Sequence, residues 1–439
     1  MKTLQVSLIL CIALGIATAQ EQTKAPALHS FVVIRAGTLI DGKSDQPRQN
    51  QVILIRGDLI DSVSDAASAR IPDGAQVIDL SHATVLPGMI DSHTHIMLQG
   101  EDPAAGGYDI NLFRYPLSYR VALATVSVRR ALEQGFTTLR DVETEGAGYS
   151  DIGIKQAING GFIPGPRLFV STLGISTTGG YEPEGYAPEL RIPKGVQLVD
   201  GPVEARKAAR EQLDHGADWI KIYTTHRSWV GKNGELVSQP TLTLEEIRAI
   251  TDETHGWGKK VACHAYGGIG LHRALDGGCD SIEHGLDLDD TAIAQMLKQG
   301  TWYCPTLSVY YYDWSPADTP EGQRDRKRVA VHDVSFPKAL HAGVKIVFGT
   351  DIGGIPWTEP MAQEFGRMVK LGMSPMEAIK SATSRPAEML EMAGRIGVVA
   401  PGAYADIIAV GRDPLRDINV LENVSFVMKA GKVFKNEGK

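Results

Sequence analysis

The chain has 439 residues, of which 43% are hydrophobic and 22% are charged, and its formal net charge is −8. This composition is that of an ordinary globular protein, and the length allows one large domain of ~250–300 residues plus a smaller one. The acidic balance and the absence of any run rich in lysine and arginine argue against nucleic acid as the main partner.

Residues 1–19 have the pattern of a signal peptide. Lys2 supplies the positive start, Val6 to Ala17 form an apolar run, and Ala17-Thr18-Ala19 matches an A-x-A cleavage site. The apolar run is shorter than the ~20 residues that a membrane span needs. We therefore expect cleavage near Ala19 and export to a bacterial periplasm or the medium, without stable insertion in a membrane.

The cysteine content excludes a disulfide framework. After removal of the signal peptide the chain keeps Cys263, Cys279 and Cys304. Three cysteines in a chain of this length allow at most one bridge. Stability must therefore come from a hydrophobic core and from any bound metal.

Both ends of the mature chain have short strand-like segments separated by turns, without helical periodicity. These segments are residues 31–35, 51–56 and 75–79 near the start and 405–410, 424–428 and 432–434 near the end, the last two forming a hairpin around Ala430-Gly431. We expect one small β-sandwich domain built from residues 20–85 and 396–439. Two unrelated β-extensions are the alternative.

The middle of the chain, residues 86–395, alternates apolar strand-like runs with segments of helical period, which are residues 121–134, 203–215, 244–257, 269–277, 291–299 and 336–342. Such βα repeats predict a parallel sheet, and eight strands close a (β/α)₈ TIM-type barrel of the α/β class. The predicted strands are 85–90, 136–139, 166–171, 218–223, 260–264, 279–284, 301–304 and 344–351. The long loops 97–118 and 172–200 are expected to lie over one end.

Metal-binding side chains stand at the ends of five of these strands. His93 and His95 follow the first strand, and residues i and i+2 of a strand point to the same side. An isolated pair of this kind is common on surface strands. Here, however, Lys221, His264, His284 and Asp351 end later strands. Since barrel active sites lie at that rim, the pattern predicts a metal centre.

Five motifs resemble those of the amidohydrolase superfamily, and the resemblance covers essentially the whole mature chain. They are Asp91-Ser-His-Thr-His95, Trp219-Ile-Lys-Ile-Tyr223, Cys263-His-Ala265, Ile282-Glu-His-Gly285 and Gly349-Thr-Asp351. Within the superfamily the chain is similar to the imidazolonepropionase-like branch, which includes exported Xaa-Pro dipeptidases, carboxypeptidase-like enzymes and ochratoxin-degrading amidohydrolases. The split β-domain is also a family feature.

The resemblance implies two divalent metal ions, and zinc suits the imidazole and carboxylate ligands. His93, His95 and Asp351 are expected on one ion and His264 and His284 on the other. Lys221, converted to a carbamate by CO₂, is expected to bridge both, because an uncharged or anionic group binds metal where an ammonium repels it. Lys221 as a cation paired with Asp351 is the alternative.

The catalytic and substrate-binding residues follow from the same arrangement. Asp351 is expected to take the proton of the attacking water and pass it to the leaving amine. Tyr223 lies two residues after Lys221, so its phenol is a candidate donor to the tetrahedral oxyanion, with a tyrosine capping the barrel layer as the alternative. His226 is a candidate for binding a substrate carboxylate, although a solvent-facing loop histidine is the commoner case.

We therefore predict a metal-dependent hydrolase that cuts the amide bond to a C-terminal amino acid in dipeptides, N-acyl amino acids or aryl amides such as ochratoxin. A cyclic-amide hydrolase of the hydantoinase or imidazolonepropionase type is the alternative. A non-enzymatic scaffold relative is disfavoured because all six ligand positions are present. We also expect the chain to form a homo-oligomer.

Overall fold

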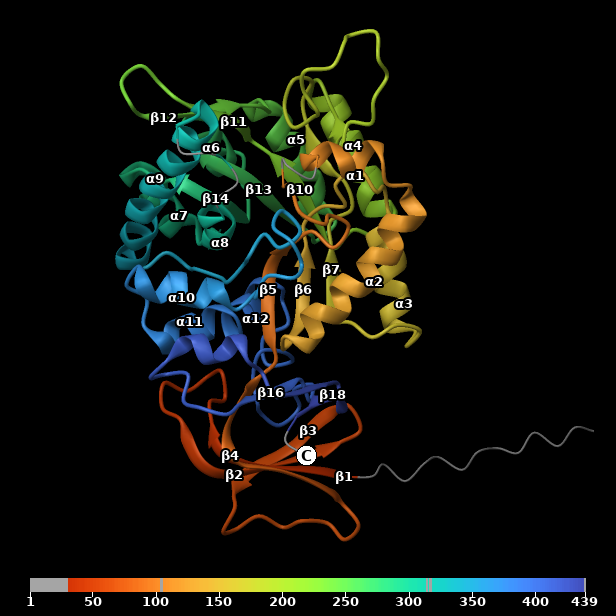
Figure 1. Cartoon of the computed structure of the whole chain (residues 1–439), viewed down its shortest axis with the longest axis vertical. Coiled ribbons are helices and arrows are strands. Elements are labelled where there is room, and N and C mark those ends of the chain that lie inside the picture. Colours follow the sequence, from red (N-terminus) through yellow and green to blue (C-terminus); the bar gives the residue numbers. More distant parts are fainter. Residues whose placement is uncertain (1–30, 103–105, 313–314, 316–317, 438–439) are drawn as a thin grey trace, which may run out of the picture.

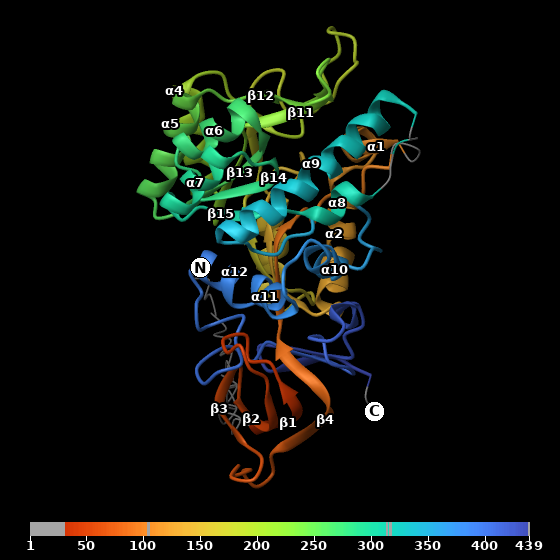
Figure 2. The same ribbon diagram turned by 90° about the vertical axis from the view of Figure 1, so that its left-hand side faces the viewer.

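The computed structural model describes residues 31–102, 106–312, 315 and 318–437. The predicted signal peptide, residues 1–19, lies outside these described ranges. Figures 1 and 2 show a β-sheet built from both ends of the chain at one end of the molecule and a larger α/β body at the other. Strand β5 leads from the first part into the second.

The terminal sheet has seven strands in the order β18-β17-β16-β4-β1-β2-β3. Its strands are β1 (Phe31–Leu39), β2 (Arg48–Arg56), β3 (Leu59–Asp65), β4 (Gln76–Pro87), β16 (Ile407–Val410), β17 (Phe426–Lys429) and β18 (Lys432–Asn436). The predicted hairpin around Ala430-Gly431 is confirmed, with Lys429 opposite Lys432.

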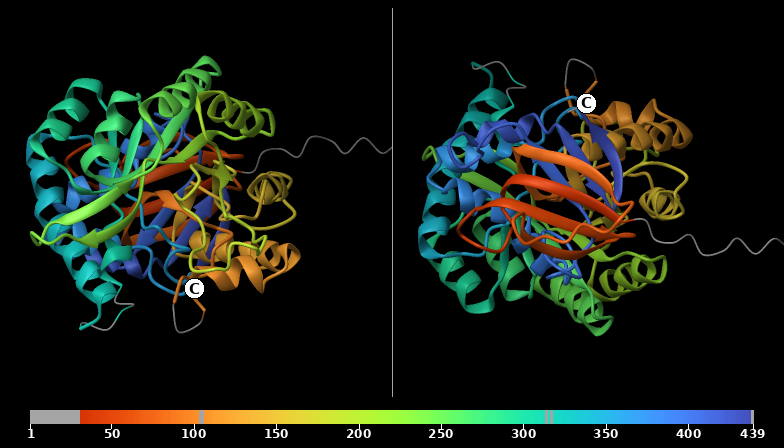
Figure 3. Two further views of the ribbon diagram at one scale, coloured as in Figure 1. Left: turned by 90° about the horizontal axis from the view of Figure 1, so that it is seen from above. Right: turned by 90° about the horizontal axis from the view of Figure 1, so that it is seen from below.

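The expected β-sandwich is not confirmed, because both ends of the chain enter one sheet. Strand β4 pairs in parallel with β1 and antiparallel with β16, so the C-terminal strands extend the N-terminal sheet instead of packing on it. Figure 3, seen from below, shows the N-terminal and C-terminal strands side by side. Buried apolar side chains such as Ile34, Ile53 and Ile407 form a hydrophobic cluster of this sheet with Val398 and Val399.

The larger body has the TIM-barrel type of fold. A three-stranded parallel sheet holds β5 (Met89–Thr94), β6 (Phe136–Asp141) and β7 (Arg167–Val170). A six-stranded sheet has the order β15-β14-β13-β10-β8-β9, with strands β8 (Gly174–Ser176), β9 (Gln197–Leu198), β10 (Trp219–Tyr223), β13 (Lys260–Gly267), β14 (Ser281–Asp287) and β15 (Trp302–Cys304). The predicted strands except the last are found within a few residues, although the predicted strand 85–90 covers the end of β4 and only the start of β5.

The predicted eighth strand is not a regular strand, and the two sheets do not close into one ladder. Isolated bridges join Ile346 to Tyr303 and Ile352 to Thr94. Single backbone hydrogen bonds link this segment to β15 and β5. Val347 N donates to the Tyr303 oxygen and Ser92 N donates to the Phe348 oxygen, both at 2.9 Å. Residues 344–351 therefore run between β15 and β5 with irregular pairing.

Six helices confirm the predicted helical segments, and they cover the outside of the parallel strands (Figure 3). They are α2 (Leu117–Glu133), α4 (Pro202–Asp214), α5 (Leu244–Gly256), α6 (Gly268–Asp276), α7 (Asp290–Gln299) and α9 (Pro320–Ala342). Local signals set their ends. Thr243 and Glu246 form a capping box at the start of α5, and Gly300 ends α7 in the left-handed conformation.

Further elements complete the chain around the mouth and base of the barrel. The helices are α1 (Gly107–Phe113), α3 (Ser150–Asn159), α8 (Leu307–Tyr311), α10 (Gln363–Lys370), α11 (Pro375–Ser381), α12 (Ser384–Met389) and the 3₁₀ helix η2 (Ile418–Glu422). A hairpin is formed by β11 (Thr225–Val230) and β12 (Leu236–Pro240). Among the described residues no helix combines the length and apolar character that crossing a bilayer requires.

One disulfide joins Cys263 in β13 to Cys279 before β14, and Cys304 is a buried free thiol. The single bridge agrees with the prediction of at most one. Both bridged residues lie in the hydrophobic core, and Cys263 directly precedes His264. The bridge therefore secures the strand that carries one of the predicted metal ligands.

We predict that Cys279→Ala lowers the free energy of unfolding by about 3 kcal/mol, because a loop of this size constrains the unfolded chain by that amount. Denaturant unfolding with and without a reducing agent measures the effect. The reductant should destabilise the wild type by a similar amount and leave Cys279→Ala unchanged. Equal stability of the oxidised wild type and the variant would contradict the stabilising role of the bridge.

Candidate metal centre

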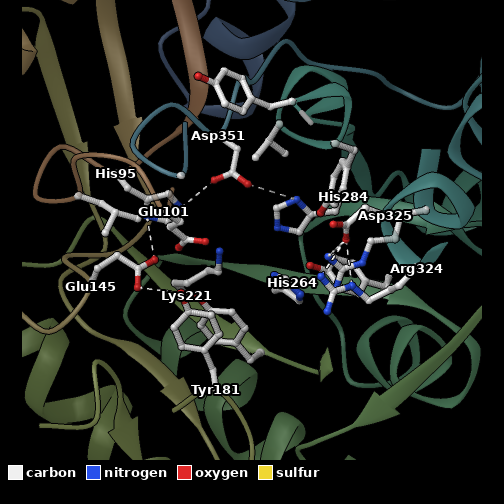
Figure 4. Close-up of a pocket in the computed structure, with 18 of the residues that line it drawn as sticks. His95, Glu101, Glu145, Tyr181, Lys221, His264, His284, Arg324, Asp325 and Asp351 are labelled. Atoms are coloured by element: carbon white, nitrogen blue, oxygen red, sulfur yellow. Dashed lines mark hydrogen bonds and ion pairs between the residues drawn. The ribbon is translucent and has the colours of Figure 1, made fainter. Parts of the chain in front are cut away.

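The six predicted ligands converge at the C-terminal end of the parallel strands. His93 and His95 end β5, Lys221 lies in β10, His264 in β13, His284 in β14, and Asp351 follows the irregular eighth segment. All except His93 line a cavity of about 290 Å³. Figure 4 shows Asp351 facing Lys221 across this cavity, with His95 on one side and His264 and His284 on the other.

Asp351 is the centre of the histidine cluster. Its Oδ1 atom lies 3.1 Å from His95 Nε2 and 3.5 Å from His93 Nε2, and its Oδ2 atom lies 3.8 Å from His284 Nδ1. Burial opposes ionisation of this carboxyl, but the neighbouring histidines outweigh burial and hold its pKa below the usual range. Asp351 is therefore an anion at neutral pH.

A buried carboxylate, Glu283, fixes the orientation of the His93 ring. Its Nδ1 atom donates to Glu283 Oε2 at 2.7 Å, and Glu283 Oε1 accepts from Arg140 Nη2 at 2.8 Å. Burial opposes ionisation of Glu283 but Arg140 and His93 lower its pKa. Burial and the nearby Lys221 lower the pKa of His93 to about 4. A neutral imidazole with Nδ1–H on a carboxylate presents its Nε2 lone pair to the site.

The donor atoms fit divalent metal ions. His93 Nε2 and His264 Nε2 are buried and have no hydrogen-bond partner in the part of the chain that the structure describes. Ligand atoms of His93, His284 and Asp351 lie within 4.8 Å of one another. Burial lowers the pKa of His264 and of His284 well below the usual range, which keeps both imidazoles neutral. Unpartnered, neutral, buried imidazoles are what a metal ion binds.

Lys221 is almost completely buried, with 1% of its surface exposed. Its Nζ atom lies 5.0 Å from the centre of the Tyr223 ring. The alternative pairing of Lys221 with Asp351 is not found among the ion pairs of the described residues. A buried lysine without a counter-ion at the centre of a histidine cluster is compatible with chemical conversion of its amine.

Carboxylates on the His95 side of the cavity were missed in the sequence analysis. Tyr223 donates from its hydroxyl to Glu143 Oε2 at 2.5 Å, while Glu145 Oε2 accepts from Tyr108 at 2.9 Å and Tyr181 at 3.1 Å. Glu145 Oε1 also lies 3.4 Å from His95 Nδ1. Glu143 and Glu145 are two residues apart just after β6, the same spacing that revealed the histidine pair, so the signal was present.

A third carboxylate, Glu101, lines the cavity in the loop after β5. Burial, with Glu145 and Asp351 nearby, raises the pKa of Glu101 to about 8. Burial and the adjacent Glu145 also raise the pKa of Glu143 well above its usual range. The expectation that residues 97–118 and 172–200 lie over one end of the barrel agrees with the positions of Glu101 and Tyr181 at the cavity.

The opposite side of the cavity is cationic and aromatic. Arg324, Asp325 and Arg328 of α9 reach the cavity beside Tyr266 and Tyr310. Arg324 Nε donates to Asp325 Oδ1 at 2.9 Å, and Arg328 Nε donates to Ser228 Oγ at 2.8 Å. Sequence reasoning missed this group because it placed the helix only over residues 336–342.

The predicted substrate-binding residues occupy different positions. Tyr223 lines the cavity and stacks on Tyr181 with 4.3 Å between ring centres. His226 does not line it: its Nδ1 atom donates to the Gly180 oxygen at 3.1 Å, and its ring meets Tyr181 edge-on. Burial, Arg227 and Arg328 lower the pKa of His226 to about 4. His226 is thus a neutral side chain behind Tyr181.

Comparison with known proteins adds independent information. The model of the amidohydrolase family matches residues 84–434. Ochratoxinase from Aspergillus niger is 31% identical, over 92% of this chain and 87% of its own length. A Xaa-Pro dipeptidase crystal structure with bound methionine has a TM-score of 0.83 at 36% identity and covers 93% of this chain and 100% of that one. Imidazolonepropionase from Cutibacterium acnes is 25% identical over 82% and 85% of the two chains.

The contact between Glu283 and His93 predicts a supporting role in metal binding. Glu283→Gln removes the charge that holds the Nδ1–H tautomer, so metal affinity should fall ~10–100-fold. Competition with a chelator, followed by metal analysis, measures the change. Glu388→Gln, an exposed change on α12, is the control. Unchanged affinity in Glu283→Gln would show that Glu283 does not support the ligand.

Proposed function

This chain belongs to the amidohydrolase family, and we propose that it hydrolyses the amide bond between an acyl group and a C-terminal amino acid. Dipeptides, N-acyl amino acids and aryl amides such as ochratoxin are the candidate substrates. The observation that carries this proposal is a cavity with metal-binding groups at its centre and arginines at one side. The names of two relatives, ochratoxinase and Xaa-Pro dipeptidase, support the same bond type.

We propose that the cluster holds two divalent ions, most simply Zn²⁺. His93, His95 and Asp351 would hold one, His264 and His284 the other, and Lys221 as a carbamate would lie between them. Bound there, the ions would polarise the scissile carbonyl and acidify a water molecule. The unpartnered Nε2 atoms of His93 and His264 and the buried Lys221 support this arrangement.

Asp351 is the proposed proton carrier. It is ionised at neutral pH, lines the cavity and lies between histidines from two strands. A carboxylate in that state accepts a proton from the attacking water and delivers it to the nitrogen of the leaving amino acid. Without this transfer the leaving group would depart as an amide anion, which is a poor leaving group.

Tyr223 remains the proposed donor to the oxyanion. In the structure its hydroxyl donates to Glu143 Oε2, and this contact fixes the ring at the wall of the cavity. We propose that the hydroxyl turns from Glu143 toward the substrate oxygen as negative charge develops there, and donates its hydrogen bond to that oxygen.

The arginines are better placed than His226 to bind the carboxylate of the leaving amino acid. Arg324 and Arg328 line the cavity, whereas His226 is neutral and behind Tyr181. A guanidinium binds a carboxylate through two parallel hydrogen bonds. We assign the carboxylate to these arginines and leave His226 a role in supporting Tyr181.

We also propose that the chain is exported and that its signal peptide is removed near Ala19. The Cys263–Cys279 bridge supports this proposal, since disulfides persist in oxidising compartments. Assembly as a homo-oligomer stays a prediction from the sequence.

Lys221→Ala is predicted to reduce the metal content from about two ions per chain and to abolish activity. Added short-chain carboxylates should restore part of the activity, because they supply the two oxygens that the carbamate would provide. Metal analysis and activity assays with and without acetate measure both effects, with the exposed Lys345→Ala as control. Full activity of Lys221→Ala, or active wild type with a single ion, would contradict the bridging carbamate.

Asp351→Asn is predicted to keep the fold while kcat falls by at least ~10²–10⁴-fold with a smaller change in KM. The amide remains a weak oxygen ligand but carries no proton at neutral pH. Steady-state kinetics, with circular dichroism and metal analysis as controls, measure the effect. A variant that keeps both metal and kcat would remove Asp351 from the proton transfer.

The substrate assignment is tested by a screen of linear and cyclic amides on the purified mature chain. We expect turnover of dipeptides or N-acyl amino acids with a free C-terminal carboxylate. Arg328→Met should raise KM for these substrates because the carboxylate loses its partner. Opening of hydantoins or imidazolones with every linear amide left intact would favour the cyclic-amide alternative.

A further inference from the structure

Glu101 is held rigidly at the edge of the catalytic cavity. Its backbone N donates to the Gly354 oxygen at 3.0 Å, and the preceding Gly100 N donates to the Gly353 oxygen at 2.7 Å. These bonds fix the loop after β5 to the residues that follow Asp351. The Glu101 side chain is partly buried and lines the cavity. Its position is therefore determined by the same segment that carries the catalytic carboxylate.

The Glu101 carboxylate lacks a partner, in contrast to its neighbours. Glu145 accepts hydrogen bonds from Tyr108 and Tyr181 and lies beside His95. Asp351 is surrounded by histidines. For Glu101 no hydrogen bond or ion pair of the carboxylate is found within residues 31–102, 106–312, 315 and 318–437. Burial raises the pKa of this carboxyl to about 8, but a substrate cation beside it would favour its ionised form, in which both oxygens can bind that cation.

The electrostatic surroundings of Glu101 favour a positive charge next to it. Glu145 and Asp351 act on it as like charges, and Arg328 is its one opposing cation among the groups that act on it most strongly. An ammonium in the cavity beside Glu101 would interact favourably with Glu101 and Glu145, whereas Asp351 is assigned to a metal ion. A neutral acyl group in the same place would leave this acidic side of the cavity without a counter-charge.

The cavity has opposite charges on its two sides. Figure 4 shows Glu101 and Glu145 on the side of His95, and Arg324 with Asp325 on the side of His264 and His284. Lys221 and Asp351, where the scissile carbonyl is proposed to bind, lie between the two sides. An extended dipeptide spans about 7 Å and carries an ammonium at one end and a carboxylate at the other. Its ammonium group would face Glu101 and Glu145, and its carboxylate would face the arginines on the other side of the cavity.

We propose that Glu101 is a specificity-determining residue that binds the free α-ammonium group of a dipeptide and so selects dipeptides over N-acyl amino acids. The inference rests on the proposed function and narrows its substrate class. It assigns the ammonium to Glu101 and leaves the carboxylate to the arginines. Glu101 takes no part in the bond cleavage itself.

A substrate series on the unmodified enzyme provides the first test. Alanyl-phenylalanine carries the ammonium, lactyl-phenylalanine replaces it with a hydroxyl of similar size, and N-acetylalanyl-phenylalanine removes its charge. We expect kcat/KM for alanyl-phenylalanine to be ~10–100-fold higher than for either analogue, as for loss of a hydrogen bond to a charged group. Equal kcat/KM for the three substrates would overturn the inference.

Glu101→Gln provides the second test, because it removes the charge and keeps the size. We expect it to lower kcat/KM for alanyl-phenylalanine ~10–100-fold and to leave the two analogues unchanged. Asp109→Asn is the matched control: Asp109 is in α1 of the same loop region, accepts a hydrogen bond from Tyr186 and does not line the cavity. An equal loss on all three substrates in Glu101→Gln would overturn the assignment.

The outcomes separate the two proposals. Hydrolysis of the analogues without preference for the free ammonium leaves the proposed amide hydrolysis standing and removes the role of Glu101. Failure of the enzyme to cut any of the three, and any other linear amide of the screen above, overturns both proposals. Should Glu101→Gln lose its metal or fail to fold, Glu101→Ala and the substrate series on the unmodified enzyme still decide the question.

Discussion

The buried guanidinium of Arg140 joins the strands that carry the candidate metal ligands. Its Nε donates to the Ser92 oxygen at 2.6 Å, its Nη1 to Ser281 Oγ at 3.0 Å and its Nη2 to Glu283 at 2.8 Å, while its plane covers the Trp219 ring. These contacts connect β6 with β5, β14 and β10. A charge this deeply buried requires a counter-charge and hydrogen-bond partners, so the position of Glu283, and through it of His93, is tightly constrained.

A second buried network places the irregular eighth segment. Asp91 accepts from His93 N at 3.0 Å and from the Thr350 hydroxyl at 2.6 Å, which ties the start of the histidine motif to the residue before Asp351. Gly349 makes the approach possible, because a Cβ there would lie 2.3 Å from Cys304 Sγ. Asp351 itself has φ of 60°, a conformation that costs of order 1–3 kcal/mol in a residue other than glycine. The two networks hold it there.

The sequence predicted the helices and strands that local residue patterns encode. It predicted poorly the features that depend on pairing between strands far apart in the chain. The alternation of apolar strands with amphipathic helices gave seven barrel strands and six helices, and the strand ends brought all six ligand positions together. The sequence predicted that both ends of the chain form one β-domain, but not that β4 pairs with β16 and so joins their strands in a single sheet, because strand pairing across more than 300 residues leaves no local pattern. The first two thirds of α9 were missed because residues 320–335 are rich in charge and carry no clear apolar stripe. Arg324 and Arg328 lie in that part.

The proposed catalytic groups and the proposed selectivity groups come from different parts of this fold. The candidate metal ligands stand on strands or immediately after them, where the buried networks of Arg140 and Asp91 allow little variation. The charged groups on the cavity walls, Glu101 on one side and Arg324 and Arg328 on the other, come from a loop and a helix outside the sheet. Proteins named for different substrates match this chain over most of its length, so the shared barrel does not select the substrate. Substrate selection must therefore come from the loops and helices outside the parallel strands. Among their features, the acidic and basic side chains on opposite sides of the cavity have the most direct chemical meaning.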